Sequence, residues 1–234
     1  MSTQALGPVQ TFCVNTFNEA VDRRDVKTLD ALIDLHPELT HVQDIVHGDT
    51  FLHWMADGSM TSWVSWALDK GIDVNIPNKH GDTALHIAAN LDDGDMVDLL
   101  VARGANIEAL DKNGNTPLGI AGGFGCEMAL ERLMKHGAHP WVLDNRGQSF
   151  ITSFLNCDSH RDWEQSLATA KAIEGMLNSN EEIGALAWET MQNNPTNLAL
   201  NQQRFPSLVC ALEATWLRKQ QPQAIVQAPS RPRF

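Results

Sequence analysis

One short pattern returns along this chain every 33 residues (81 − 48 = 33), and this period constrains the fold more than any other feature. The pattern begins at a glycine and continues with a threonine or serine, at Gly48, Gly81, Gly114 and, in a weaker copy, Gly147. A second series of glycines keeps the same spacing, at Gly71, Gly104 and Gly137. Two series that share one period indicate a repeat architecture, in which each copy packs mainly against its neighbours.

The copy from Gly81 to Asn106 shows which kind of repeat this is. It begins Gly-Asp-Thr-Ala-Leu-His-Ile-Ala-Ala and ends Leu-Leu-Val-Ala-Arg-Gly-Ala-Asn. This resembles the ankyrin repeat, whose pattern is glycine-x-Thr-Pro-Leu-His-x-Ala-Ala and later Leu-Leu-x-x-Gly-Ala. The resemblance implies an all-α fold, a solenoid of stacked helix-turn-helix units with short β-turn tips.

The residue types within each copy fit that arrangement. Thr50, Thr83 and Thr116 stand where a first helix would begin, and a threonine oxygen there can accept an unpaired backbone N–H. Pro117 suits the first turn of its helix, because no N–H is needed there. The second helix carries an apolar stripe, as in residues 96–100, and then ends at a glycine that tolerates the left-handed conformation.

The period also sets the expected domain limits. Residues 44–143 hold three clear copies, and residues 1–43 read as a divergent N-terminal capping repeat. Residues 144–180 read as a degenerate copy that contains an insertion, because its second helix comes late in the register. Divergence at the ends is expected, since one side of a terminal copy must face water.

The C-terminal part is expected to cap the stack. Residues 181–219 predict two helices, 181–193, ended by Pro195, and 205–219, which has an apolar side. Residues 220–234 contain three prolines and no long apolar run, which predicts a disordered tail.

The charge of the chain narrows the class of partner. The formal net charge is −12, and the first 217 residues carry 13 basic and 29 acidic side chains (13 − 29 = −16). Such a charge repels phosphate backbones, so nucleic acid is not an expected partner, whereas a protein with a basic surface is favoured. The acidic cluster Asp92, Asp93, Asp95 and Asp98 would serve such a partner, or it is only a solvated edge.

Composition also bears on the compartment. No stretch approaches the roughly 18 uncharged apolar residues that a membrane helix needs. The N-terminus shows no basic run followed by an apolar run, so no secretory signal is expected. The four cysteines are dispersed and read as free thiols. We therefore expect a cytoplasmic protein, with secretion by a signal-independent route as the alternative.

Patterns of catalysis and cofactor binding are missing from the sequence. It has no Gly-rich phosphate loop, nucleophile elbow or paired zinc motif, so we expect no catalytic residue, no metal site and no cofactor. Cys157 with His160 is the most testable enzyme hypothesis, against an incidental cysteine in a surface loop. His53 and His86 suit metal binding or base catalysis, but the resemblance implies that they bond to backbone between neighbouring copies.

The resemblance places the expected function on a concave surface made by the turn tips and first helices. Trp54 and Phe124 stand out there, because large aromatic side chains are enriched among residues that dominate binding energy. Packing between copies is the alternative for Trp54. The candidate partner-binding residues are His47, Asp49, Trp54, Lys79, His80, Asp82, Asn90, Leu91, Lys112, Asn113, Asn115, Phe124 and Arg146.

Three functional hypotheses follow. The first is a monomeric adaptor or inhibitor that binds one protein partner, and the resemblance extends to short bacterial effectors and immunity proteins. The second is an effector in which residues 150–220 carry an unrecognised activity and the repeats only dock it. The third is a structural role, in which exposed tryptophans assemble an oligomer.

Overall fold

The computed structural model describes residues 19–20, 23, 25–36, 39, 43–44, 46–156, 163–177 and 181–220. The chain divides into two compact units, Met1–Pro117 (unit 1) and Leu118–Phe234 (unit 2). Every named element in the described part is an α-helix, and extended pairing there is limited to isolated bridges, Gln43 with Thr50 and Leu143 with Ser149. The predicted all-α class is confirmed.

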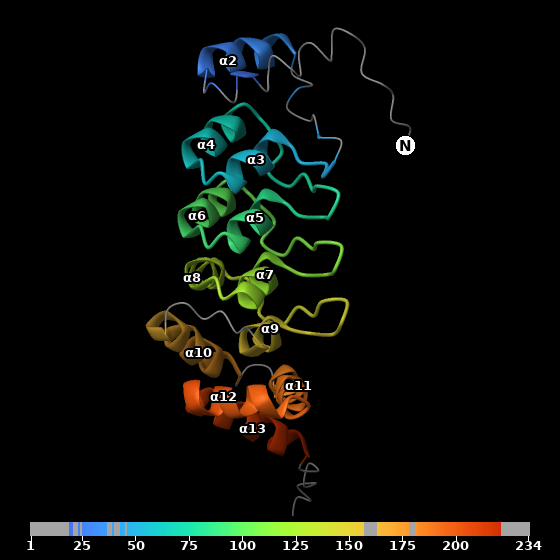
Figure 1. Ribbon diagram of the computed structural model, residues 1–234, viewed down its shortest axis with the longest axis vertical. Coiled ribbons are helices and arrows are strands. Elements are labelled where there is room, and N and C mark those ends of the chain that lie inside the picture. Colours follow the sequence, from blue (N-terminus) through green and yellow to red (C-terminus); the bar gives the residue numbers. More distant parts are fainter. Residues whose placement is uncertain are drawn as a thin grey trace, which may run out of the picture. The chain divides into compact units, whose positions relative to one another are not determined.

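In the part of unit 1 that the structure describes, the named elements are one helix followed by two helical hairpins. The helices are α2 (Val26–Leu35), α3 (Phe51–Asp57), α4 (Thr61–Asp69), α5 (Ala84–Asn90) and α6 (Gly94–Ala102). The first helices of the two hairpins, α3 and α5, pack against each other. The second helices, α4 and α6, do the same. Figure 1 shows the turn tips of this unit projecting on the side of α3 and α5, away from α4 and α6.

Local chemistry explains where these helices start and stop. Thr50 and Thr83 are the N-cap residues of α3 and α5, as the sequence predicts, and each forms a capping box with the histidine three positions on. Asp93 caps α6 through its side chain, which accepts the Met96 N–H at 2.9 Å. After α4 and α6 come Gly71 and Gly104, with φ of 86° and 88°.

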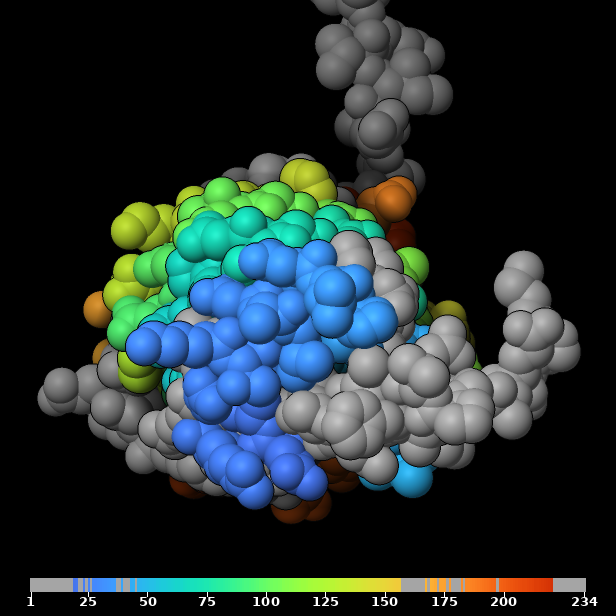
Figure 2. All heavy atoms as spheres, turned by 90° about the horizontal axis from the view of Figure 1, so that it is seen from above, coloured from blue at the N-terminus to red at the C-terminus, as the bar shows by residue number. Residues whose placement is uncertain are grey.

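Small and large apolar residues share the core of unit 1. Leu52 and Leu85 are buried at equivalent places in α3 and α5, and Ala56 and Ala89 are fully buried beside them. Alanine at these positions lets the helices approach closely. Leu29 of α2 is also fully buried, and Figure 2 shows α2 lying over the next helix pair in the view from above.

In unit 1, polar side chains connect α2 with α4 and α4 with α6. Lys70, before the first helix-ending glycine, reaches back to Asp30 at 2.9 Å, and the Trp66 indole donates to the same carboxylate at 2.9 Å. One period later, Arg103 reaches back to Asp69 at 3.0 Å and to the Ser65 hydroxyl at 2.8 Å. Because these side chains are partly exposed, the ion pairs contribute little to the free energy of folding. Their main effect is to align each helix with the next.

Among its described residues, unit 2 begins with two more hairpins and continues with three further helices. Its helices are α7 (Pro117–Phe124), which starts at the unit boundary, α8 (Glu127–Lys135), α9 (Phe150–Asn156), α10 (Trp163–Leu177), α11 (Glu181–Gln192), α12 (Pro195–Arg204) and α13 (Pro206–Gln220).

Specific buried contacts hold the parts of unit 2 together. The Thr169 hydroxyl of α10 donates to the Glu127 carboxylate of α8 at 3.0 Å, and both side chains are buried. The Asn201 amide of α12 donates to the Leu155 carbonyl of α9 at 2.7 Å. Helix α11 packs closely on α13, where Gly184 faces Thr215.

The C-terminal region departs from the sequence expectation in one element. The sequence predicted two helices after residue 180, with Pro195 as a stop, whereas the structure has three and Pro195 begins α12. Proline is tolerated in a first helical turn because its missing N–H would have no partner there. The predicted disordered tail is residues 220–234; Gln220 is the last residue of α13, and residues 221–234 lie outside the described residues. Most of the predicted insertion, residues 157–162, also lies outside them.

Candidate functional site

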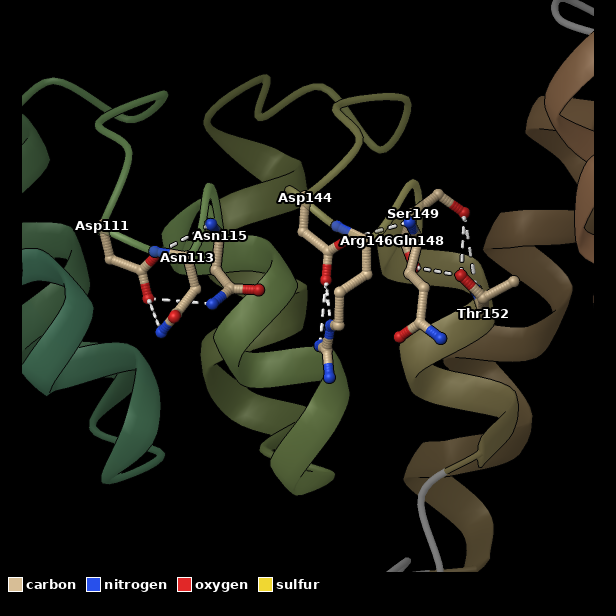
Figure 3. Close-up of polar contacts among 8 residues, drawn as sticks. All are labelled: Asp111, Asn113, Asn115, Asp144, Arg146, Gln148, Ser149 and Thr152. Atoms are coloured by element: carbon tan, nitrogen blue, oxygen red, sulfur yellow. Dashed lines mark hydrogen bonds and ion pairs between the residues drawn. The ribbon is translucent and has the colours of Figure 1, made fainter.

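Each turn tip is organised by one Asp or Asn side chain at its start, namely Asp44, Asn78, Asp111 and Asp144. In the third tip, Oδ1 of Asp111 accepts the N–H groups of Asn113 and Asn115, both at 2.8 Å (Figure 3). The other tips repeat this pattern of two backbone donors on one side-chain oxygen. The side chain thus satisfies backbone groups that the turn itself leaves unpaired.

These hydrogen bonds also fix the charge of the tip carboxylates. Partial burial opposes ionisation of Asp44, but the N–H groups of His47, Asp49 and Val46 outweigh it and lower the pKa of its carboxyl below the ordinary 3.8. In Asp144 the same balance, with the Gln148 N–H and the Arg146 side chain as the largest favourable contributions, also lowers the pKa. Asp44 and Asp144 therefore stay charged at neutral pH.

Neighbouring tips of unit 1 are joined through backbone. The Lys79 N–H donates to the His47 carbonyl at 2.8 Å, and one period on the Lys112 N–H donates to the His80 carbonyl at 2.9 Å. The Asn78 amide adds a bond to the Asp49 carboxylate at 2.9 Å. Because the backbone groups are used within the stack, the tips present side chains to solvent.

A histidine in each of the first two hairpins joins one copy to the next. His53 Nε2 lies 2.9 Å from the Asp82 carbonyl, and His86 Nε2 lies 3.2 Å from the Asn115 carbonyl. Both rings are buried, at 1% and 2% exposed. The expectation that these histidines bond to backbone across copies is confirmed.

The structure places the predicted partner-binding residues in two groups. Most are solvent-facing, and within unit 1 they share the side of the tips and first helices; these are His47, Trp54, Lys79, His80, Asn90, Leu91, Lys112 and Asn113. Phe124 and Arg146, in unit 2, are also exposed. We call the unit 1 set the tip face.

The second group faces inward. Asp49, Asp82 and Asn115 are half-buried, and Asn115 donates to the Asp111 carboxylate at 2.8 Å within its own tip. Arg146, although exposed, binds Asp144 of the same tip at 2.9 Å. The observed contacts of these side chains stabilise the turn tips rather than face a partner.

Sequence reasoning overlooked exposed leucines at one repeated position before the turn tips. Leu110 and Leu143 are 56% and 43% exposed, and each directly precedes the Asp that opens a tip. Their shared register was the signal that could have identified them.

Titratable clusters in the described residues suit structure better than chemistry. Ligand atoms of Asp44, His47 and Asp49 lie within 4.8 Å of one another. However, both carboxylate oxygens of Asp44 already accept backbone N–H groups, and Asp49 accepts the Asn78 amide. Cys157 and His160 lie outside the described residues, so the hypothesis of a catalytic thiolate–histidine pair stays a prediction.

In the described part of unit 2, a small open cavity of about 120 Å³ lies between α10 and the start of α13. Its floor is apolar, with Ala170, Phe205 and Leu208, and Lys171 and Glu174 of α10 also line it. Among the helices described, none is long and apolar enough to cross a membrane.

Comparison with known proteins identifies the repeat. A family model described as "Ankyrin repeats (3 copies)" matches residues 17–111 and, in an overlapping match, residues 52–144. Together the matches cover residues 17–144, more than half of the chain. A search of curated proteins finds no match to this chain.

Proposed function

Because this chain belongs to the ankyrin-repeat family, we propose that it is an adaptor or inhibitor that holds one protein partner on its tip face. Ankyrin repeats are generally protein-interaction modules, and their fold is typically non-catalytic. The proposal extends this general role to a particular surface.

The observation that carries the proposal is where large apolar side chains meet solvent. On the tip face of unit 1, Trp54 on α3 is 36% exposed and Leu91 at the end of α5 is 41% exposed. In unit 2, taken by itself, Phe124 at the end of α7 is 59% exposed. In α4 and α6 every large apolar side chain is at least half-buried, although Leu35 at the end of α2 is exposed. Exposed apolar groups gathered on one face mark a binding surface more than scattered ones do.

Charged groups around this face suggest the character of the partner. Lys79 and Lys112 extend from the tips, whereas Asp57 and Asp95 are exposed at the ends of the helical hairpins. A partner that carries basic groups opposite the helix ends and acidic groups opposite the tips would match both. We place the protein in the cytoplasm as part of the proposal, because its four cysteines are dispersed along the sequence and form no disulfide-type framework, as is usual in a reducing compartment.

The test starts from a pull-down out of the native cell, followed by affinity measurements between the purified partner and variants of this chain. We expect Trp54→Ala and Phe124→Ala each to cost about 2 kcal/mol of binding, or roughly thirtyfold, as for residues that dominate an interface. Leu217→Ala is the matched control, because Leu217 is 48% exposed on α13.

Charge reversal completes the test. Lys79→Glu with Lys112→Glu should slow association and change its salt dependence, since exposed charges act mainly on the rate of encounter. Binding that survives both aromatic changes and this reversal would show that the partner does not use these residues.

A further inference from the structure

The protonation state of the two linking histidines is fixed by their partners. Nδ1 of His53 lies 3.1 Å from the backbone nitrogen of Thr50, whose N–H donates to it. Nδ1 of His86 likewise lies 3.1 Å from the backbone nitrogen of Thr83. A backbone N–H can only donate, so Nδ1 must accept in both rings. Each ring must therefore carry its single proton on Nε2 and donate it to the carbonyl of the next copy.

A second proton would break this arrangement. Protonated Nδ1 becomes a donor, and the threonine N–H then loses its acceptor. The threonine hydroxyl, 2.8 Å from Nδ1 in the first copy and 3.0 Å in the second, can accept the new proton, but the buried N–H stays unsatisfied. A buried donor without a partner is costly, so acid favours states in which the histidine has left its place.

We propose that mild acid uncouples the first three copies of the stack, through protonation of His53 and His86, and leaves the fourth copy unaffected. The link that opens joins α3 to the second tip and α5 to the third tip. These are the elements that present the tip face, although the inference itself does not depend on the proposed function.

The fourth copy, in unit 2, offers the internal contrast. Ser149 and Thr152 occupy the places of the threonine and histidine, and the Thr152 hydroxyl donates to the Ser149 carbonyl at 2.7 Å (Figure 3). The third copy has Gly119 at the histidine position. Hydroxyl groups do not titrate in this range, so acid sensitivity at this position is confined to the two histidines.

The surroundings of the His86 ring set the direction of the effect in the second copy. For His86, burial lowers the pKa below its ordinary 6.5 and outweighs the Asn115 carbonyl and the carboxylates of Asp82 and Asp111, which act in the opposite direction. The folded copy thus prefers the neutral ring. Its contribution to stability is complete above pH 6.5 and is lost as the pH falls through the folded pKa.

Nuclear magnetic resonance on the full chain tests the proposal. At pH 7.5 the ring nitrogen signals of His53 and His86 should show the Nε2–H form. Between pH 7.5 and 5.5, amide exchange corrected for its intrinsic rate should show roughly fivefold loss of protection at Thr50 and Thr83, as expected when a bond worth about 1 kcal/mol is lost. Protection at Thr152 should stay unchanged.

Variants separate these histidines from other titrating groups. His53→Gln with His86→Gln should abolish the pH dependence in unit 1, whereas His80→Gln, which changes an exposed histidine in the second tip, should preserve it. If the double variant does not fold, the wild-type ring titrations and amide protection decide alone. Rings in the Nδ1–H form, or acid loss of protection that is equal at Thr152, would overturn the proposal.

Discussion

At the scale of single residues, a turn tip depends on one side chain and one glycine. The side chain of Asp111 supplies the acceptor for two N–H groups, and the glycine supplies a conformation that other residues resist. Gly81 shows why the second requirement is strict. Its φ is 86°, and a Cβ there would lie 2.8 Å from the Lys112 nitrogen in the next tip. A Cβ at Gly81 would therefore be opposed both by backbone strain and by the close approach of the next tip.

We predict that Gly81→Ala destabilises unit 1 more than Gly104→Ala. Both glycines have a left-handed φ, which costs an alanine about 1–2 kcal/mol. Only Gly81 faces backbone of the adjacent tip, whereas a Cβ at Gly104 would meet nothing within 4 Å. Urea unfolding monitored by tryptophan fluorescence checks this. Equal losses would mean that the tips move apart at little cost.

At the scale of elements, the helices of unit 2 are positioned by contacts that the repeat does not supply. Glu127 stands in the first turn of α8, where a carboxylate is favourable, and is buried beneath α10. Thr169 of α10 meets it at 3.0 Å, which sets where the helix after the insertion lies on α8. The α11–α13 pair is instead held close by the absence of a side chain at Gly184.

Removal of the Thr169 hydroxyl tests the first of these contacts. Thr169→Val keeps the shape but withdraws a buried donor from a carboxylate, and we expect a loss of about 1.5–3 kcal/mol in the free energy of unfolding. Thr169→Ser retains the hydroxyl and should cost less. Chemical denaturation of both variants gives the comparison, and a Val variant as stable as wild type would assign the position of α10 to apolar packing.

Two helical glycines in unit 2 should respond to alanine with opposite sign. A Cβ at Gly184 would lie 2.6 Å from the Thr215 oxygen, so Gly184→Ala must separate α11 from α13 and destabilise the unit. Gly175 in α10 is exposed and has nothing within 4 Å, so Gly175→Ala should stabilise by about 0.5–1 kcal/mol through helix propensity. Thermal melts of the two variants should shift in opposite directions, and a shift in the same direction would contradict this account.

At the scale of the whole molecule, charge and exposed apolar side chains act against each other. The net charge of −12 disfavours self-association. The exposed aromatic side chains of Trp54 and Phe124 favour association with another molecule. A partner that supplies complementary charge resolves this better than a second copy of the same acidic chain, which is the physical basis for preferring an adaptor or inhibitor over an oligomer.

The oligomer hypothesis makes a separate prediction about mass. We expect light scattering after size exclusion to return the monomer mass of 25.8 kDa at physiological salt. The same measurement in high salt, where repulsion is screened, is the more demanding test. A dimer that dissociates on Trp54→Ala would assign Trp54 to self-assembly and not to a partner.

The copies, the threonine caps and the linking histidines can be read from the sequence alone. Those features depend on residues three or four positions apart, as in Thr83 with His86, or on one residue repeated at a fixed period, as in the glycines. Local rules of this kind are readable without coordinates. Only tertiary structure decided which tip side chains turn inward, as Asn115 does, and that Pro195 begins a helix. It also decided where α10 lies, because that depends on Glu127 and Thr169, which are 42 residues apart and belong to no repeated pattern.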